Sequence, residues 1–118
     1  MNYRITTEPD FLREAKRLAK KYKSFKRDLE LLQEELLANP TAGADLGGGV
    51  HKVRMAIAAK NRGKSHGARV ITYVFALDES NGRITLLTVY DKAERESIPA
   101  ARVAELLSLA KARVGVTE

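Results

Sequence analysis

The most restrictive feature of the sequence is a succession of three segments rich in β-branched and aromatic residues, at 50–57, 69–77 and 83–90. Apolar and polar residues alternate along the first segment, as expected for a strand with one buried face. The last two segments are separated by a short polar stretch that ends in Asn81-Gly82, and these residues readily adopt the positive φ angles of a hairpin turn. The pattern therefore predicts three consecutive antiparallel strands.

Two amphipathic helices are predicted before these strands and one after them. The first is expected over 9–22 with Thr7 as its cap, because a proline and an acidic residue at its start fit the first helical turn. The second is expected over 25–38, with Ser24 as its cap and an Asn-Pro pair that ends it. The third, over 99–113, has apolar residues at helical spacing.

The remaining segments complete a single domain, 1–118, which is an ordinary length for one domain. Residues 2–6 alternate and predict an edge strand, whereas the glycine-rich residues 41–49 and the polar residues 58–68 are interpreted as loops. The expected fold class is α+β, with an N-terminal strand and a helical hairpin packed on a small antiparallel sheet, and a C-terminal helix. We expect the helices on one face of the sheet and the other face partly open.

The net charge of +6 is concentrated in one part of the chain. No Asp or Glu occurs between Leu46 and Leu77, whereas this stretch contains six cations: Lys52, Arg54, Lys60, Arg62, Lys64 and Arg69. These six equal the whole net charge, because basic and acidic residues balance elsewhere. Such a block predicts a polyanion-binding site, although basic residues more commonly form a solvated surface.

The composition argues against several other function classes. The chain has no cysteine, so disulfides and thiolate metal sites are impossible. We expect no cofactor and no metal ion, because the carboxylates form no convincing ligand cluster. The apolar runs are too short to span a membrane, and the first residues lack the apolar core of a secretory signal. These features predict a cytoplasmic protein without a membrane partner.

The cations on the predicted strands are candidates for an active site. Lys52 and Arg54 are two residues apart on one strand and therefore share a face. Arg69 begins the next strand, and Tyr90 and Lys92 lie at the end of the last one. We expect these five side chains to converge on one concave patch, with a geometry that depends on the strand register.

Such a patch contains the groups that cleavage of RNA requires. RNA supplies its own nucleophile, the 2′-hydroxyl, so an enzyme has to accept its proton, stabilise the phosphate and protonate the leaving 5′-oxygen. Cations stabilise the developing charge, and a lysine among other cations can act as a base near neutral pH. We interpret Lys52 as the base and Arg54 and Arg69 as a clamp on the phosphate, with no metal required.

Polar residues of the loop 58–68 are interpreted as phosphate contacts that add affinity without sequence choice. They are Lys60, Arg62, Lys64 and His66. These strand candidates also have structural alternatives. Considered individually, Lys52 and Arg54 are ordinary solvent-facing strand residues. Tyr90 either packs within the sheet or contacts the substrate. His51 is expected on the sheet face opposite Lys52, away from the site.

Three runs of the sequence carry a family resemblance: His51-Lys52-Val53-Arg54-Met55-Ala56, Gly67-Ala68-Arg69-Val70-Ile71-Thr72-Tyr73 and Leu86-Leu87-Thr88-Val89-Tyr90-Asp91-Lys92-Ala93-Glu94. In kind and order these residues resemble the RelE/ParE superfamily of bacterial toxins, nearest to its RelE and HigB branch. The resemblance extends from about Phe11 to Ile98 and so covers most of the chain. It is a pattern of residue types in order, more specific than composition and less specific than a metal-ligand motif.

The resemblance implies a RelE-like fold and a toxin of a type II toxin–antitoxin system. Such a toxin is an mRNA interferase, an endoribonuclease that binds and cleaves messenger RNA in the A site of the 70S ribosome without metal and so inhibits translation. A cognate antitoxin protein neutralises it. By this resemblance Lys52, Arg54 and Arg69 are basic residues of the site. Lys92 matches a basic residue of the turn after the last strand, and Tyr90 matches a tyrosine of HigB-like relatives.

The chain departs from the family pattern at two places, and two other functions remain as alternatives. Ala93 stands where some RelE proteins have an arginine, and no tyrosine follows Tyr90, so the assignment of acid and base stays open. The ParE branch shares the scaffold and inhibits DNA gyrase by binding, although the basic strand pair argues against a non-nuclease inhibitor. A DNA-binding part of a toxin–antitoxin repressor is the third interpretation.

Overall fold

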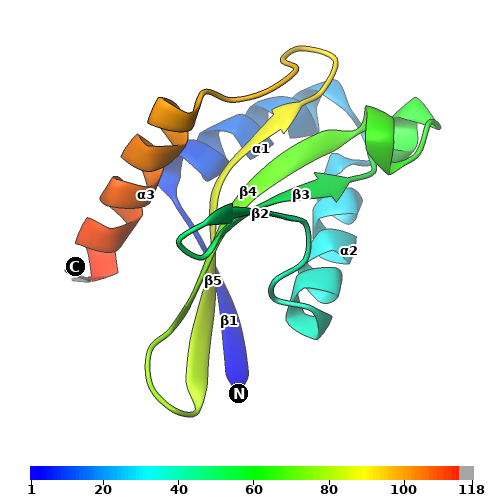
Figure 1. The fold of residues 1–118 in the computed structure, drawn as a ribbon. Coiled ribbons are helices and arrows are strands. Elements are labelled where there is room, and N and C mark those ends of the chain that lie inside the picture. The colour runs from blue at the N-terminus through cyan, green and yellow to red at the C-terminus, as the bar shows by residue number, and fades with distance from the viewer. Residues whose placement is uncertain (115–118) are drawn as a thin grey trace.

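The computed structural model describes residues 1–114 as one twisted five-stranded sheet with three helices around it (Figure 1). The elements are β1 (Asn2–Thr7), α1 (Pro9–Lys21), α2 (Phe25–Ala38), β2 (Ala44–Gly47), β3 (Val50–Met55), the 3-10 turns η1 (Ala58–Lys60) and η2 (Lys64–His66), β4 (Ala68–Ala76), β5 (Asn81–Asp91) and α3 (Ala100–Val114). The expected α+β class is confirmed. The expected domain, 1–118, includes residues 115–118, which lie outside the described residues.

The three predicted antiparallel strands are confirmed as β3, β4 and β5. The strand order is β1-β5-β4-β3-β2, with antiparallel β3–β4 and β4–β5 pairs and a parallel β1–β5 pair. The N-terminal strand is therefore an edge strand, as expected, and it makes the sheet mixed. At the β4–β5 turn, Asp78 accepts hydrogen bonds at 2.8 Å from the backbone N–H groups of Ser80 and Asn81.

The interpretation of 41–49 as a loop is wrong in part, because β2 forms within it. β2 pairs antiparallel with β3 and makes the second edge of the sheet. The glycines at 47–49 all have positive φ, between 62° and 90°, which L-residues rarely adopt. Asp45 also accepts a hydrogen bond of 2.7 Å from the N–H group of Gly47. The glycine run is thus a tight hairpin turn, and the apolar pattern of β2 is too short to predict a strand.

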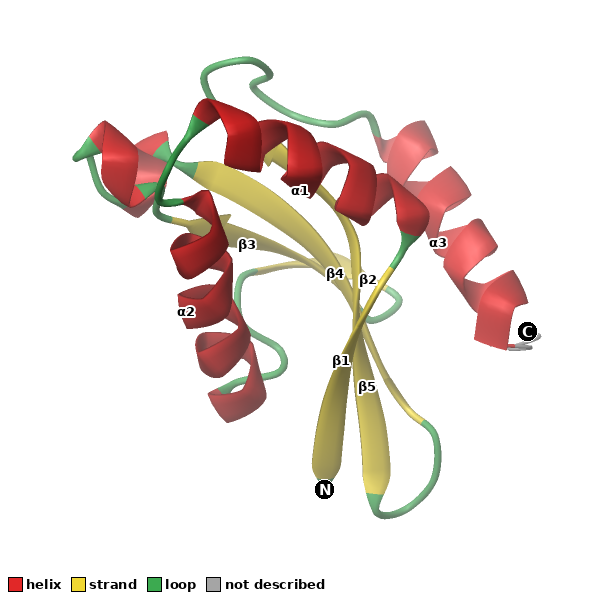
Figure 2. Ribbon diagram, turned by 180° about the vertical axis from the view of Figure 1, so that it is seen from behind, coloured by secondary structure: helices red, strands yellow, loops and turns green. Residues whose placement is uncertain are grey.

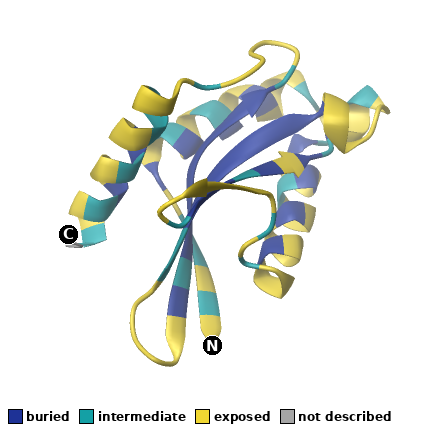
Figure 3. Ribbon diagram, in the orientation of Figure 1, coloured by how far each residue is buried: buried dark blue, intermediate teal, exposed yellow. Residues whose placement is uncertain are grey.

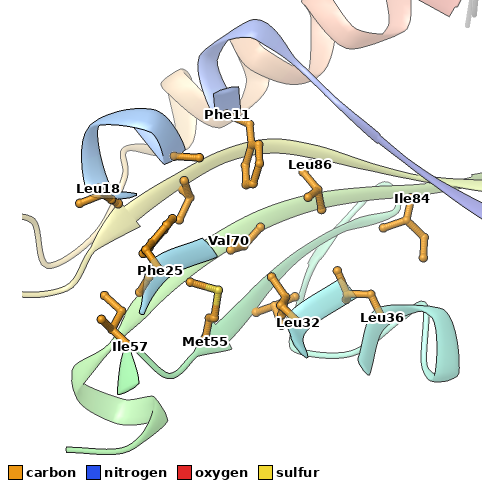
Figure 4. Close-up of a cluster of buried hydrophobic side chains, with 14 residues drawn as sticks. Phe11, Leu18, Phe25, Leu32, Leu36, Met55, Ile57, Val70, Ile84 and Leu86 are labelled. Atoms are coloured by element: carbon orange, nitrogen blue, oxygen red, sulfur yellow. The ribbon is translucent and has the colours of Figure 1, made fainter. Parts of the chain in front are cut away.

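The expectation that all helices lie on one sheet face is also wrong. α1 and α2 cover one face, seen from the front in Figure 2, and enclose a core that includes Phe11, Phe25, Val70 and Leu86 (Figure 4). α3 packs on the other face, where Leu106 and Ala110 join a second cluster of buried residues: Val50, Ile71, Tyr73, Leu87 and Tyr90. The middle strands are therefore buried on both faces, whereas β2 is exposed (Figure 3).

Both predicted helix caps differ in detail from the structure. Glu8, not Thr7, precedes α1, and Pro9 occupies its first turn. Ser24 does precede α2, but its hydroxyl accepts no capping hydrogen bond from a backbone N–H group of the helix. Within residues 1–114, no helix is long and apolar enough to cross a membrane.

Replacement of Leu86 by alanine tests the helix-side core. Leu86 is fully buried there, so Leu86→Ala is expected to lower the free energy of unfolding by about 2–5 kcal/mol through lost burial and the cavity left behind. Leu77 has half of its surface exposed, so the matched change Leu77→Ala should cost less than about 0.5 kcal/mol. Urea unfolding of the two variants measures the difference, and equal losses would contradict this description of the core.

Candidate active site

Cations of β3, β4, η2 and the turn after β5 line one groove beside β3. The register makes Arg54 and Arg69 cross-strand neighbours, and Tyr90 is the neighbour of Arg69 on its other side. The groove has a volume of about 540 Å³. The cations that line it are Lys52 and Arg54 of β3, Lys64 of η2, Arg69 of β4 and Lys92 of the turn after β5. The structure thus brings together Lys52, Arg54, Arg69 and Lys92, four of the five candidates on or next to the strands. Of the four loop candidates, it adds Lys64.

Arg69 forms a buried part of the groove wall and has an unusual environment for a charged side chain. Only 6% of its surface is exposed. Its guanidinium donates hydrogen bonds to three backbone carbonyl groups, those of Lys64 and Ser65 at 3.2 Å and that of Ala68 at 3.1 Å. Within residues 1–114 it forms no ion pair with a carboxylate. Because buried charges are normally paired, this arrangement favours an anionic ligand.

The rest of the groove is also cationic. Within the described part of the chain, Lys52, Arg54 and Lys92 likewise form no ion pair. Among the described residues that line the groove, Glu35 of α2 is the one acidic residue, and it is neutralised by Lys64, whose Nζ lies 3.1 Å from its carboxylate. The groove therefore keeps a large excess of positive charge, as a phosphate-binding surface requires.

Other candidates lie outside the groove. Tyr90 is buried in the cluster beneath α3, and its hydroxyl has no hydrogen-bond partner among residues 1–114. Burial raises the pKa of this phenol, against the opposing effect of the charges of Arg69 and Arg95. Arg62 and His66 are exposed in the loop and do not line the groove. His51 is buried beside Lys52 in sequence but on the opposite face, as expected.

Lys60 has a structural position that differs from the expected phosphate contact. Its side chain is only 13% exposed, and its Nζ lies 2.5 Å from a carboxylate oxygen of Asp91. The same ammonium donates to the carbonyl oxygen of His66 at 2.9 Å. Because Lys60 is held in these contacts and does not line the groove, we infer that it holds the loop 58–68 against the end of β5.

Asp91 is fully buried at the end of β5 and joins α1, η1 and the following turn. Besides Lys60, its carboxylate accepts hydrogen bonds from the hydroxyl of Tyr22 at 2.5 Å and from the N–H group of Ala93 at 2.9 Å. Burial alone would raise the pKa of Asp91, but the hydrogen bonds from Lys60, Tyr22 and Ala93 outweigh it and hold the pKa below its usual value. The residue is therefore ionised near neutral pH.

Glu94 attaches the same turn to the exposed side of α1. Its carboxylate accepts a pair of hydrogen bonds from Arg17, at 2.6 and 3.1 Å, and one from Lys21 at 2.8 Å. Hydrogen bonds from Arg17 and then Lys21 lower the pKa of Glu94 to about 2, although partial burial opposes them. These partners come from α1, a distant part of the sequence.

Asp28 is a second buried carboxylate that the sequence analysis missed. It accepts hydrogen bonds from the hydroxyl of Ser24 at 2.8 Å and from the N–H group of Ala58 at 3.2 Å, so it ties the start of α2 to η1. An acidic residue on the apolar side of a predicted helix, four positions after a serine, is the signal that identifies it. Asp91 offers a similar signal, because it directly follows the predicted strand 83–90.

Within residues 1–114, no group of three or more His, Asp or Glu residues is arranged to hold a metal ion. In a comparison with known protein families, the family model described as RelE toxin of the RelE/RelB toxin–antitoxin system matches residues 12–118. The match includes every residue that lines the groove.

Removal of the Tyr90 hydroxyl tests whether this group has a structural role. Because the hydroxyl is buried without a partner among the described residues, Tyr90→Phe is expected to leave the free energy of unfolding unchanged or to raise it by up to about 1 kcal/mol. Urea unfolding measures the effect. A clear loss of stability would mean that the hydroxyl makes a hydrogen bond that this structure does not contain.

The ion pairs of Glu94 predict a pH dependence of stability. The pKa of Glu94 is lowered from 4.5 to about 2 in the folded protein, so the unfolded chain binds more protons between these values and stability falls as the pH falls through them. Because the group is partly exposed, we expect its share to be about 0.5–1 kcal/mol. Unfolding of wild type and Glu94→Gln at pH 7, 4 and 2 should show a difference at pH 7 that is mostly lost at pH 2, and a difference of the same size at all three pH values would contradict this role of Glu94.

Proposed function

The chain belongs to the RelE toxin family of toxin–antitoxin systems, and on that premise we propose that it is an endoribonuclease that cleaves messenger RNA. The proposed substrate is the message in the A site of the 70S ribosome, and the proposed product is a 2′,3′-cyclic phosphate with a free 5′-hydroxyl. A cognate antitoxin protein would neutralise the toxin by covering the groove.

One observation carries this proposal: the buried guanidinium of Arg69 has carbonyl groups but no carboxylate as partners among residues 1–114. An uncompensated buried cation raises the free energy of the unliganded protein, and a phosphate diester in the groove would supply the missing charge. Arg54, its neighbour across the β3–β4 pair, is exposed and free to approach the same phosphate. A protein that acts only by binding another protein has no need of this arrangement.

The proposed reaction follows from the positions of the remaining cations. Lys52 accepts the proton of the 2′-hydroxyl, and the oxygen so formed attacks the adjacent phosphorus atom. Arg54 and Arg69 stabilise the extra negative charge of the crowded phosphate. The bond from phosphorus to the 5′-oxygen then breaks, and Lys92 donates a proton to that oxygen. Each step uses a side chain that lines the groove.

The open shape of the groove supports dependence on the ribosome. Within residues 1–114, its lining provides charges for the phosphate but no aromatic side chain on which a base can stack. The groove can therefore hold a phosphate without fixing the nucleotide. In the proposed function the ribosome holds the message in position, so that the 2′-hydroxyl is aligned for attack.

Removal of three groove cations tests the proposed function. Lys52, Arg54 and Lys92 are at least partly exposed, so their replacement by alanine should spare the fold, whereas Arg69 is buried and holds the η2 loop. Induction of the wild type in a bacterial host is expected to arrest growth and to produce new 5′ ends in translated messages. The triple variant should do neither.

A matched variant controls for the loss of three charges. Lys16, Lys20 and Lys26 are exposed on α1 and α2, and their triple alanine variant has the same net charge as the groove variant. With purified protein and a single-stranded RNA, only the groove variant should reduce the slope of log affinity against log salt, by about 2. Growth arrest without new 5′ ends would instead favour inhibition of DNA gyrase, and equal effects of both variants would contradict a specific groove.

A further inference from the structure

The loop η1–η2 and the turn after β5 both carry lysines of the groove, and both are fixed to the same buried carboxylate. Lys64 lies on the loop and Lys92 on the turn. Lys60 connects the loop to Asp91, because its ammonium contacts a carboxylate oxygen at 2.5 Å and the carbonyl oxygen of His66 at 2.9 Å. Lys64 and Lys92 are thus both carried by segments that are attached to one point inside the protein.

The backbone of the turn is held by Asp91 itself. The carboxylate accepts the N–H group of Ala93 at 2.9 Å, and the carbonyl oxygen of Asp91 accepts those of Glu94 and Arg95 at 3.0 Å. The N–H group of Lys92 donates to the carbonyl oxygen of Gly67, also at 3.0 Å. The backbone on both sides of the Lys92 side chain therefore has fixed partners, and its flexible stem starts from a fixed point.

The opposite side of Asp91 is anchored in the helical layer. The hydroxyl of Tyr22, directly after α1, donates to the second carboxylate oxygen at 2.5 Å, and the ammonium of Lys21 lies 3.6 Å from the same oxygen. Asp91 does not line the groove and cannot touch a phosphate there. Its contacts nevertheless connect the end of α1 with the two segments that carry Lys64 and Lys92, the η1–η2 loop and the turn after β5.

We propose that Asp91 is a positioning residue, which holds Lys92 and the η2 loop at the distance from Arg54 and Arg69 that cleavage requires. This inference rests on the proposed function, since it assigns Lys92 to the protonation of the 5′-oxygen. A displacement of about 1 Å at a group that reacts can reduce the rate on the order of 100-fold. Asp91 thus affects the rate through Lys92 without contacting RNA.

A double-mutant cycle distinguishes positioning from a general loss of stability. Asp91→Asn removes the charge that holds Lys60 and is expected to lower the cleavage rate at saturating ribosome-bound message about 10- to 100-fold, with RNA affinity changed less than about threefold. In a Lys92→Ala background, the same change should lower the rate less than about threefold, because the group that Asp91 positions is already absent. An undiminished effect in that background would overturn the proposal.

A second measurement needs no catalytic activity. Amide hydrogen exchange at Lys92 and Ala93 is expected to accelerate about tenfold or more in Asp91→Asn, whereas the amides of β4 stay protected. Tyr22→Phe removes one hydrogen bond and keeps the charge, so it should give a smaller change of the same kind if Asp91→Asn folds poorly. Unchanged exchange in both variants would refute the positioning role.

Asp28→Asn provides the matched control. Asp28 is buried to a similar degree and also anchors η1, but within residues 1–114 it forms no hydrogen bond or ion pair with the turn after β5. This variant should lose stability while exchange at Lys92 and Ala93 stays at the wild-type rate. If the wild type cleaves no message, the proposed function fails, and the exchange experiment still decides whether Asp91 holds the turn. If both aspartate variants accelerate exchange in the turn equally, the effect is global and the positioning role is wrong.

Discussion

The geometry of the groove depends on the hydrogen bonds that the buried carboxylate of Asp91 accepts. A carboxylate removed from water needs several hydrogen bonds, and Asp91 receives them from Tyr22, Lys60 and the backbone of Ala93. These donors come from the residue directly after α1, from the loop before β4 and from the turn after β5. The requirement to satisfy one charge therefore fixes three distant parts of the chain relative to one another, and two of them form the rim of the groove.

The groove itself has the opposite electrostatic character. Arg69 is buried, yet its partners are neutral carbonyl groups, and Lys52 and Arg54 have no acidic partner among the described residues. Charges placed in this way repel one another and reduce the stability of the free protein. The two cores on either side of β4 and β5 offset this cost, since they bury large side chains on both faces of the sheet. A stable scaffold thus carries a site that favours an anionic ligand.

Much of the fold follows from local patterns, whereas its layering does not. The alternation over Val53 and Met55 identifies the buried face of β3, and Asn81-Gly82 identifies the hairpin that joins β4 to β5. By contrast, β2 depends on pairing with β3, and its four exposed residues have no apolar pattern of their own. α3 is evident as a helix, but its sequence does not say which sheet face it covers, because either face would bury an apolar stripe.

The sequence by itself determined the family, the strand cations and the fact that Lys52 and Arg54 share the face opposite Val53 and Met55, because alternation along a strand is a local property. Only the tertiary structure decided that Arg69 lies beside Arg54, that Lys60 contacts Asp91 and that Tyr90 belongs to the core beneath α3. These facts depend on the register between strands and on contacts between residues far apart in the chain. The sequence alone does not distinguish a lysine or arginine that is paired with a buried carboxylate from one that is free to bind a phosphate.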